Sequence, residues 1–241
     1  MGGGHLEWQA IALARQTLAE RATSPATSTP WVRWSQTFAL GPTLGQCCGG
    51  VMVLGFEPLS DQALSQWPTK APRFHLELHG AGHVGQAIIR LLTDIDCTVR
   101  WIDQRLDDQP ASGESVGLPS EGELSQLPSH IRWLATDEAA SEVPEAPAGS
   151  THLVLTHRHD LDLSIMNAIL RRPDVLDGRA WVGLIGSNTK RAAFEHRLEA
   201  KGHEASAVAL ITCPIGLPGI TGKEPSVIAI AVVAQLLQRH L

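Results

Sequence analysis

The segment from Gly80 to Gly85 reads G-A-G-H-V-G, and it constrains the fold of this chain more than any other feature. It follows a short apolar run at residues 74–78 and precedes a helical pattern at 83–93, and Asp103 closes the next apolar run. In such a unit, the glycines allow a tight turn, close approach of a phosphate and close contact between helix and sheet. Amide groups at the helix start attract the phosphate, and the acidic residue binds a ribose hydroxyl. We therefore predict a Rossmann-like domain whose candidate cofactor-binding residues are Gly80, Gly82, His83, Gly85 and Asp103. Bound NAD(P) is a separate hypothesis, because the same fold serves other ligands.

Short apolar runs alternate with helical patterns over residues 73–241, which is typical of an α/β fold with a mostly parallel sheet. The predicted strands are residues 74–78, 97–102, 130–134, 152–156, 180–185 and 207–211. The predicted helices are residues 83–93, 161–171, 188–201 and 225–240. Residues 104–128 are rich in proline, glycine, serine and acidic residues, and we expect them to be irregular.

The first 57 residues have a different pattern. They predict one helix at residues 6–21 and two strands at 31–39 and 50–56, an α+β arrangement. These elements hold too few large apolar side chains to build a core alone, so residues 1–57 are expected to be an incomplete domain. Residues 58–72 carry prolines at both ends and are predicted to be a linker.

Polar residues follow the predicted strand at 152–156. His157, His159 and Asp160 lie where ligands collect in such folds, at the carboxyl end of a strand. Histidine and aspartate bind metals or move protons, but this group lacks a third well-placed ligand, so we favour contact with a polar ligand over a metal. A cap on the next helix, by Asp160 or Asp162, is the structural alternative.

Two further loops end in helix starts. Gly186, Ser187 and Lys190 follow the predicted strand at 180–185, and Lys223 precedes the last predicted helix. Either a phosphate-type ligand is bound there or the residues only form turns, with Ser187 or Asn188 as a helix cap.

The adjacent cysteines Cys47 and Cys48 lie in a glycine-rich loop that reads LGQCCGG. Spacing disfavours a disulfide framework, and no C-x-x-C pair indicates structural zinc. An exposed thiol in such a loop suits sulfur transfer or contact with a soft metal, and close packing under a turn is the alternative. Since neighbouring side chains of an extended segment face opposite ways, we expect one of the two cysteines to face a ligand.

Composition excludes several classes of protein. A net charge of −6 and a pI near 6.0 argue against non-specific nucleic-acid binding. No apolar run is long enough to cross a membrane, and the first residues lack the pattern of a signal peptide, so a cytoplasmic location is expected.

Six segments in order make the chain resemble the XdhC/CoxI family. They are GGGHLEWQAI, LGPTLGQCCGG, LHGAGHVGQAI, THRHDLDL, VGLIGSNTKR and CPIGLPGITGKEPSVIAIAV. The resemblance implies a molybdenum-cofactor chaperone without enzymatic activity, which assists cofactor sulfuration by a cysteine desulfurase and delivers the cofactor to xanthine dehydrogenase. It also implies an N-terminal XdhC/CoxI domain before a Rossmann-like domain. In the family, GGGHLE follows a strand pair that this chain lacks, so we expect a truncated domain or a misplaced start.

Two other functions stay open at this point. One is an NAD(P)-dependent oxidoreductase that uses the glycine turn, with His157 or His159 as proton donor. The other is a redox or sulfur-relay protein that acts through Cys47 and Cys48. A homodimer is compatible with each of these functions, and the sequence does not choose between oligomeric states.

Overall fold

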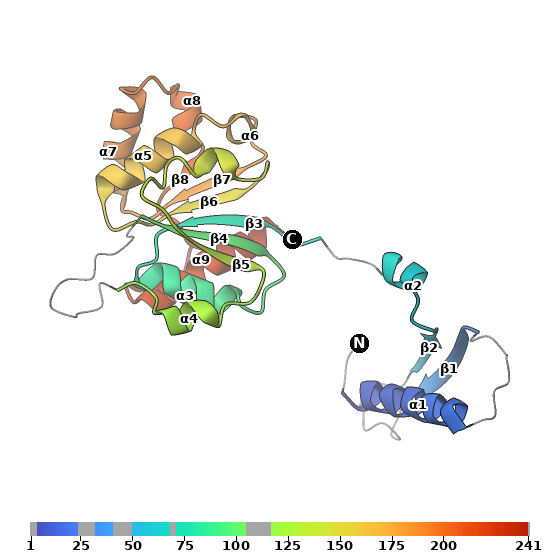
Figure 1. The fold of residues 1–241 in the computed structure, drawn as a ribbon. Coiled ribbons are helices and arrows are strands. Elements are labelled where there is room, and N and C mark those ends of the chain that lie inside the picture. The colour runs from blue at the N-terminus through green and yellow to red at the C-terminus, as the bar shows by residue number, and fades with distance from the viewer. Residues whose placement is uncertain (1–3, 24–31, 41–49, 68–70, 105–116, 241) are drawn as a thin grey trace. The chain divides into compact units, whose positions relative to one another are not determined.

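A computed structural model describes residues 4–23, 32–40, 50–67, 71–104 and 117–240 (Figure 1). The chain divides into two compact units, Met1–Lys70 and Ala71–Leu241. Over the described ranges, no helix combines the length and the apolar character needed to span a membrane.

The first unit contains a helix and a two-stranded antiparallel sheet. Helix α1 spans Gly4–Thr23, and strands β1 (Trp34–Ala39) and β2 (Val51–Phe56) pair so that the Trp34 and Phe56 rings stack with centroids 4.2 Å apart. Among the described residues of this unit, Leu6 is the one apolar side chain that is buried. A two-stranded sheet with so little core among the described residues is marginal alone. The short helix α2 (Asp61–Ser65), capped by Ser60, lies within the predicted linker.

The second unit is built on a six-stranded parallel sheet in the order β5-β4-β3-β6-β7-β8, which confirms the predicted α/β, Rossmann-like class. The apolar runs form its strands because both faces of a parallel sheet are covered. The strands are β3 (His75–His79), β4 (Thr98–Asp103), β5 (Ile131–Ala135), β6 (Thr151–Val154), β7 (Trp181–Leu184) and β8 (Ile211–Thr212).

Helices cover both faces of this sheet (Figure 1). On one face lie α3 (His83–Leu92), α4 (Glu121–Ser125) and α9 (Pro225–Arg239). On the other lie α5 (His159–Ile169), α6 (Pro173–Leu176), α7 (Asn188–Glu199), α8 (Ala205–Val208) and a 3-10 turn, η2 (Val143–Glu145). Each face has its own buried apolar cluster, so the sheet separates two cores.

Two predictions about this unit were wrong in detail. The apolar run at 207–211 is not one strand. Ala207 and Val208 belong to α8, and β8 begins at Ile211. A short apolar run fits a helical turn and a strand equally well, so periodicity could not separate them. Within the segment 104–128, helix α4 forms because Ser120 and Glu123 make reciprocal capping hydrogen bonds.

Candidate functional site

The site lies where strand order changes direction. The strands β3 and β6 are neighbours, yet the helices that follow them, α3 and α5, cover opposite faces of the sheet. The two connections therefore diverge at the carboxyl edge of the sheet, which is the usual place for a ligand in such folds. The glycine turn at 80–85 and the loop at 156–159 border this switch point.

Each glycine of the turn has a different physical role. Gly80 has a φ of +122°, and a β-carbon there would lie 2.4 Å from the Leu155 carbonyl oxygen. A β-carbon at Gly85 would lie 2.3 Å from the Gly80 carbonyl oxygen. At Gly82 a β-carbon would meet no atom of the described residues within 4 Å. Fold geometry thus requires Gly80 and Gly85, whereas Gly82 leaves space among the described residues that a ligand can enter.

Contacts from β4 and α3 fix the shape of the turn. The Ala81 amide donates a hydrogen bond to Asp103 Oδ2 at 2.6 Å, and Trp101 Nε1 donates to the Gly80 carbonyl at 3.1 Å. Gln86 Nε2 donates to the carbonyls of Ala81 and Gly117 at 3.0 and 2.7 Å. Asp103 is buried and supports the turn itself, a role that the sequence did not predict. Contact with a ribose stays a prediction.

The start of α3 offers donors to an anion. Gly82 is its N-cap and supplies no side-chain hydrogen bond. The first amides of a helix have no partner within the helix, and the helix dipole places partial positive charge there. His83 is exposed at the same end. The residues present therefore fit a phosphate group that approaches over Gly82.

Asp162 organises the loop after β6 through its buried carboxylate. From the sequence, this residue was predicted only as a possible helix cap. Asp162 lies in the first turn of α5, and its Oδ1 accepts hydrogen bonds from the Thr156 amide and hydroxyl at 2.9 and 2.7 Å. Its Oδ2 forms an ion pair with Lys190 Nζ at 2.6 Å. Asp162 is fully buried, so this pair is sheltered from water.

Lys190, a predicted contact of a phosphate-type ligand, makes several contacts within the protein. Besides Asp162, its ammonium group donates to the Ile185 carbonyl at 2.8 Å and lies 5.3 Å from the Phe194 ring centroid. Its stem passes so close to Gly186 that a β-carbon there would lie 2.5 Å from Lys190 Cδ. The structure thus uses Lys190 to connect α7 with the loop after β6. A direct contact between Lys190 and an anionic ligand stays a prediction.

The other predicted residues take separate places. His157 is exposed, and His159 makes an edge contact with Phe194, with 6.4 Å between the ring centroids. Asp160 pairs with Arg158 on the surface, which lowers the pKa of this carboxyl to about 2. Ser187 caps α7 by accepting a hydrogen bond from the Lys190 amide. This is the helix cap that the sequence offered as one of two roles for Ser187.

The remaining predicted site residues are Lys223, Cys47 and Cys48. Lys223 is exposed before α9, and over the described ranges no contact joins its side chain to the glycine turn. Cys47 and Cys48 lie outside the described residues. Among the residues that are described, no three histidine, cysteine, aspartate or glutamate side chains cluster in a metal-binding arrangement.

The strand order and the glycine turn define a Rossmann-fold protein, and the residues at the start of α3 fit an anionic group. Comparison with known proteins makes this more specific. Residues 76–236 match the family described as the XdhC Rossmann domain, so the chain belongs to the XdhC family.

Two further proteins are similar to the chain. The uncharacterized protein YqeB of Escherichia coli K12 is 26% identical over 241 residues, which is 99% of this chain and 37% of that protein. The chain thus spans little more than a third of this relative. A crystal structure of a xanthine dehydrogenase from Bacillus halodurans aligns with a TM-score of 0.47 and 19% identity, over 78% of this chain and 44% of that one.

Proposed function

We propose that this chain acts in the maturation of a xanthine dehydrogenase, as part of a chaperone that binds the molybdenum cofactor and passes it to that enzyme. The observation that carries the proposal is the match of residues 76–236 to the XdhC Rossmann domain, which includes the complete glycine turn. A cysteine desulfurase is the proposed partner for cofactor sulfuration. The chain itself is proposed to catalyse no reaction.

The geometry supports the part of this proposal that concerns the phosphate of the cofactor. The pyranopterin of the cofactor carries a phosphate, and the amides of His83, Val84 and Gly85 would hold it at the start of α3. Gly82 would admit it, since within the described ranges no atom lies within 4 Å of a β-carbon built there. When bound, the cofactor supplies a metal centre held by sulfur, for which a thiol of Cys47 or Cys48 is the proposed contact.

The proposal is tested by cofactor retention. Chain purified from cells that make the cofactor is compared with two variants, Gly82→Ala and the matched control Gly122→Ala. A β-carbon at Gly122, on α4, would meet only Ser120 Oγ at 3.9 Å, so both variants should fold. We expect wild type and Gly122→Ala to retain the fluorescent pterin and Gly82→Ala to lose it. Equal pterin contents in all three proteins would contradict the site.

A dinucleotide is the main competing ligand, and one feature favours it. Asp103 ends the strand next to the turn, at the position where a Rossmann acid binds ribose. Stoichiometric binding of NADH or NADPH, with no pterin retained, would replace the chaperone proposal by an oxidoreductase.

Full retention of pterin in Cys47→Ala and Cys48→Ala variants would remove the thiols from the site.

A further inference from the structure

Two histidines in the centre of the sheet are buried without hydrogen-bond partners. His79 ends β3 and His152 lies on the neighbouring β6, and both are 0% exposed. Their rings stack with centroids 6.2 Å apart and planes inclined by 13°. Within the described part of the chain, no partner is present for any of their ring nitrogens. Buried polar groups are normally hydrogen-bonded, so this pair adds a cost that apolar side chains would not have.

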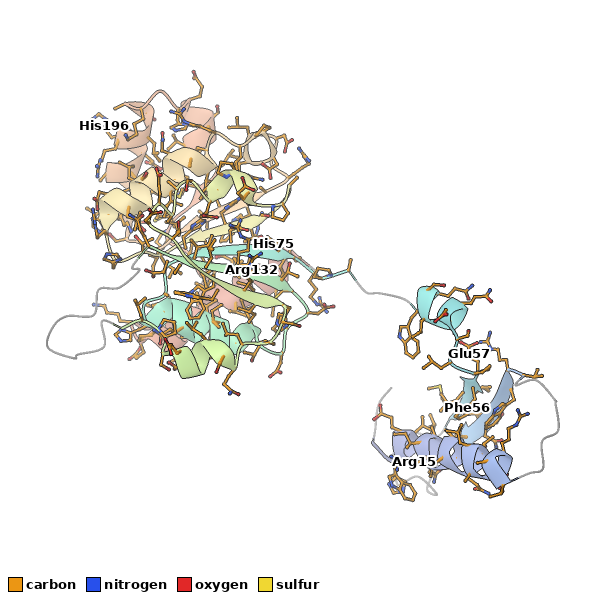
Figure 2. The ribbon with its side chains drawn as sticks, viewed as in Figure 1. Arg15, Phe56, Glu57, His75, Arg132 and His196 are labelled. Carbon is orange, nitrogen blue, oxygen red and sulfur yellow. The ribbon has the colours of Figure 1, made fainter. Side chains whose placement is uncertain are left out.

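Charged and titratable groups face the pair from each element around it. They are His75 and Glu77 on β3, Arg100 on β4, Glu142 at the start of the 3-10 turn, and Arg172 and Asp174 at the start of α6. Figure 2 shows His75 on β3, the strand that carries the row from His75 to His79. The pair is thus enclosed by a polar network on the α5 side of the sheet.

The acidic members of this network are already engaged with arginines. Arg100 lies 3.3 Å from Glu77 and 2.7 Å from Glu142, and Arg172 lies 3.0 Å from Asp174. A proton added to either ring would therefore enter a region whose negative charges are balanced. It would also face the positive charges of both arginines.

This environment holds both rings in the neutral form. Burial lowers the pKa of His79 well below its usual value, and the nearby His152 and Arg100 lower it further. Burial likewise lowers the pKa of His152 to about 3, where Arg172 adds to the effect and Asp174 opposes it.

We propose that His79 and His152 form an acid-sensitive latch in the centre of the sheet. The strands β3 and β6 stay paired while both rings are neutral, and they separate when the chain is acidified enough to protonate either ring. Because His79 directly precedes Gly80, opening of the latch also releases the glycine turn. This inference concerns the chain alone and holds whichever ligand the turn binds.

The sign follows from proton linkage. An unfolded histidine has a pKa near 6.5, so below that pH the unfolded chain binds protons that the native pair does not. Native stability is therefore complete above about pH 7 and declines as the pH falls toward the lowered native values. For each histidine, every unit by which the pH falls below the unfolded pKa raises the unfolding equilibrium constant by up to about tenfold. Two units below that pKa, the increase is about 100-fold.

The test is denaturant unfolding of the full chain between about pH 8 and pH 4.5, with wild type compared with the double variant His79→Leu/His152→Leu. We expect the double variant to be at least as stable at pH 8, and to lose most of the acid dependence of wild type. The matched control His196→Leu, at an exposed site on α7 (Figure 2), should follow the wild-type profile. Parallel profiles for wild type and the double variant would overturn the latch.

A second measurement keeps the proposal testable if the double variant does not fold. Histidine ring signals of wild type are followed by NMR during acidification and assigned with the single variants His79→Gln and His152→Gln. The His79 and His152 signals should stay at neutral-form shifts until the domain unfolds. A signal from either buried ring that titrates in the folded domain near the ordinary histidine pKa of about 6.5 would disprove the latch.

Discussion

At the residue scale, the three glycines of the turn can be separated by experiment. A β-carbon at Gly85 would overlap the Gly80 carbonyl, and a backbone atom cannot move aside without distortion of the turn. We expect Gly85→Ala to lower the free energy of unfolding by about 1–3 kcal/mol or more. Gly82→Ala should leave it unchanged within about 0.5 kcal/mol, since open space surrounds that site. Denaturant midpoints measure both, and equal losses would contradict the assigned roles.

Lys190 and Asp162 provide the second prediction at this scale. Removal of one partner leaves a buried charge without compensation, which costs about 3–5 kcal/mol. We therefore expect Lys190→Met and Asp162→Asn each to destabilise the domain strongly, and the double variant to cost less than the sum of the two. The exposed pair Arg158 and Asp160 is the control, and its loss should leave the unfolding midpoint unchanged. Strict additivity for Lys190 and Asp162 would show that the pair is not coupled.

These residues also mark the limit of the sequence-based site. The spacing of Gly80, Gly82 and Gly85 predicted the turn because local chain geometry determines it. The role of Lys190 depends on a carboxylate from another helix, so its position in GSNTKR could not reveal the contact. Asp162 was missed for the same reason, although its place in the first turn of α5 was visible as an acidic cap.

At the scale of elements, the start of α7 carries the next prediction. Ser187 accepts a hydrogen bond from the Lys190 amide, and loss of an N-cap of this kind costs about 1 kcal/mol. We expect Ser187→Ala to lower stability by about that amount, and Ser187→Asp to retain it. Pterin retention by both variants would be unchanged if Ser187 serves only as a cap. Loss of pterin from Ser187→Ala alone would assign the hydroxyl to the ligand site.

The strands were predictable to the extent that burial dictates their composition. The runs that became β3, β4, β6 and β7 are apolar because helices cover both sides of the sheet. The turn of α8 was taken for a strand because Ala207 and Val208 are buried in either conformation. The short helix α6 was not predicted because it lies in a connection where neighbouring contacts, and not periodicity, fix the backbone.

At the scale of the whole molecule, the two units differ in their means of stabilisation. The second unit has a buried apolar cluster on each face of its sheet, while Leu6 is the buried apolar residue of the first unit over the described ranges. Hydrogen exchange of the full chain should therefore be roughly 100-fold faster or more for amides of β1 and β2 than for those of β3 and β6. Similar protection in both sheets would show that the first unit has a source of stability outside its described core.

Gly186 and Lys190 constrain which sequences this fold tolerates. Any side chain at position 186 would displace the Lys190 stem, and a displaced Lys190 would leave the buried Asp162 carboxylate without its ion pair. These three positions, one in a loop and two in helices, must therefore change together or not at all. In a library that randomises position 186 alone, the folded members should carry glycine there. A library that also replaces Lys190 and Asp162 by apolar residues should accept larger side chains at position 186.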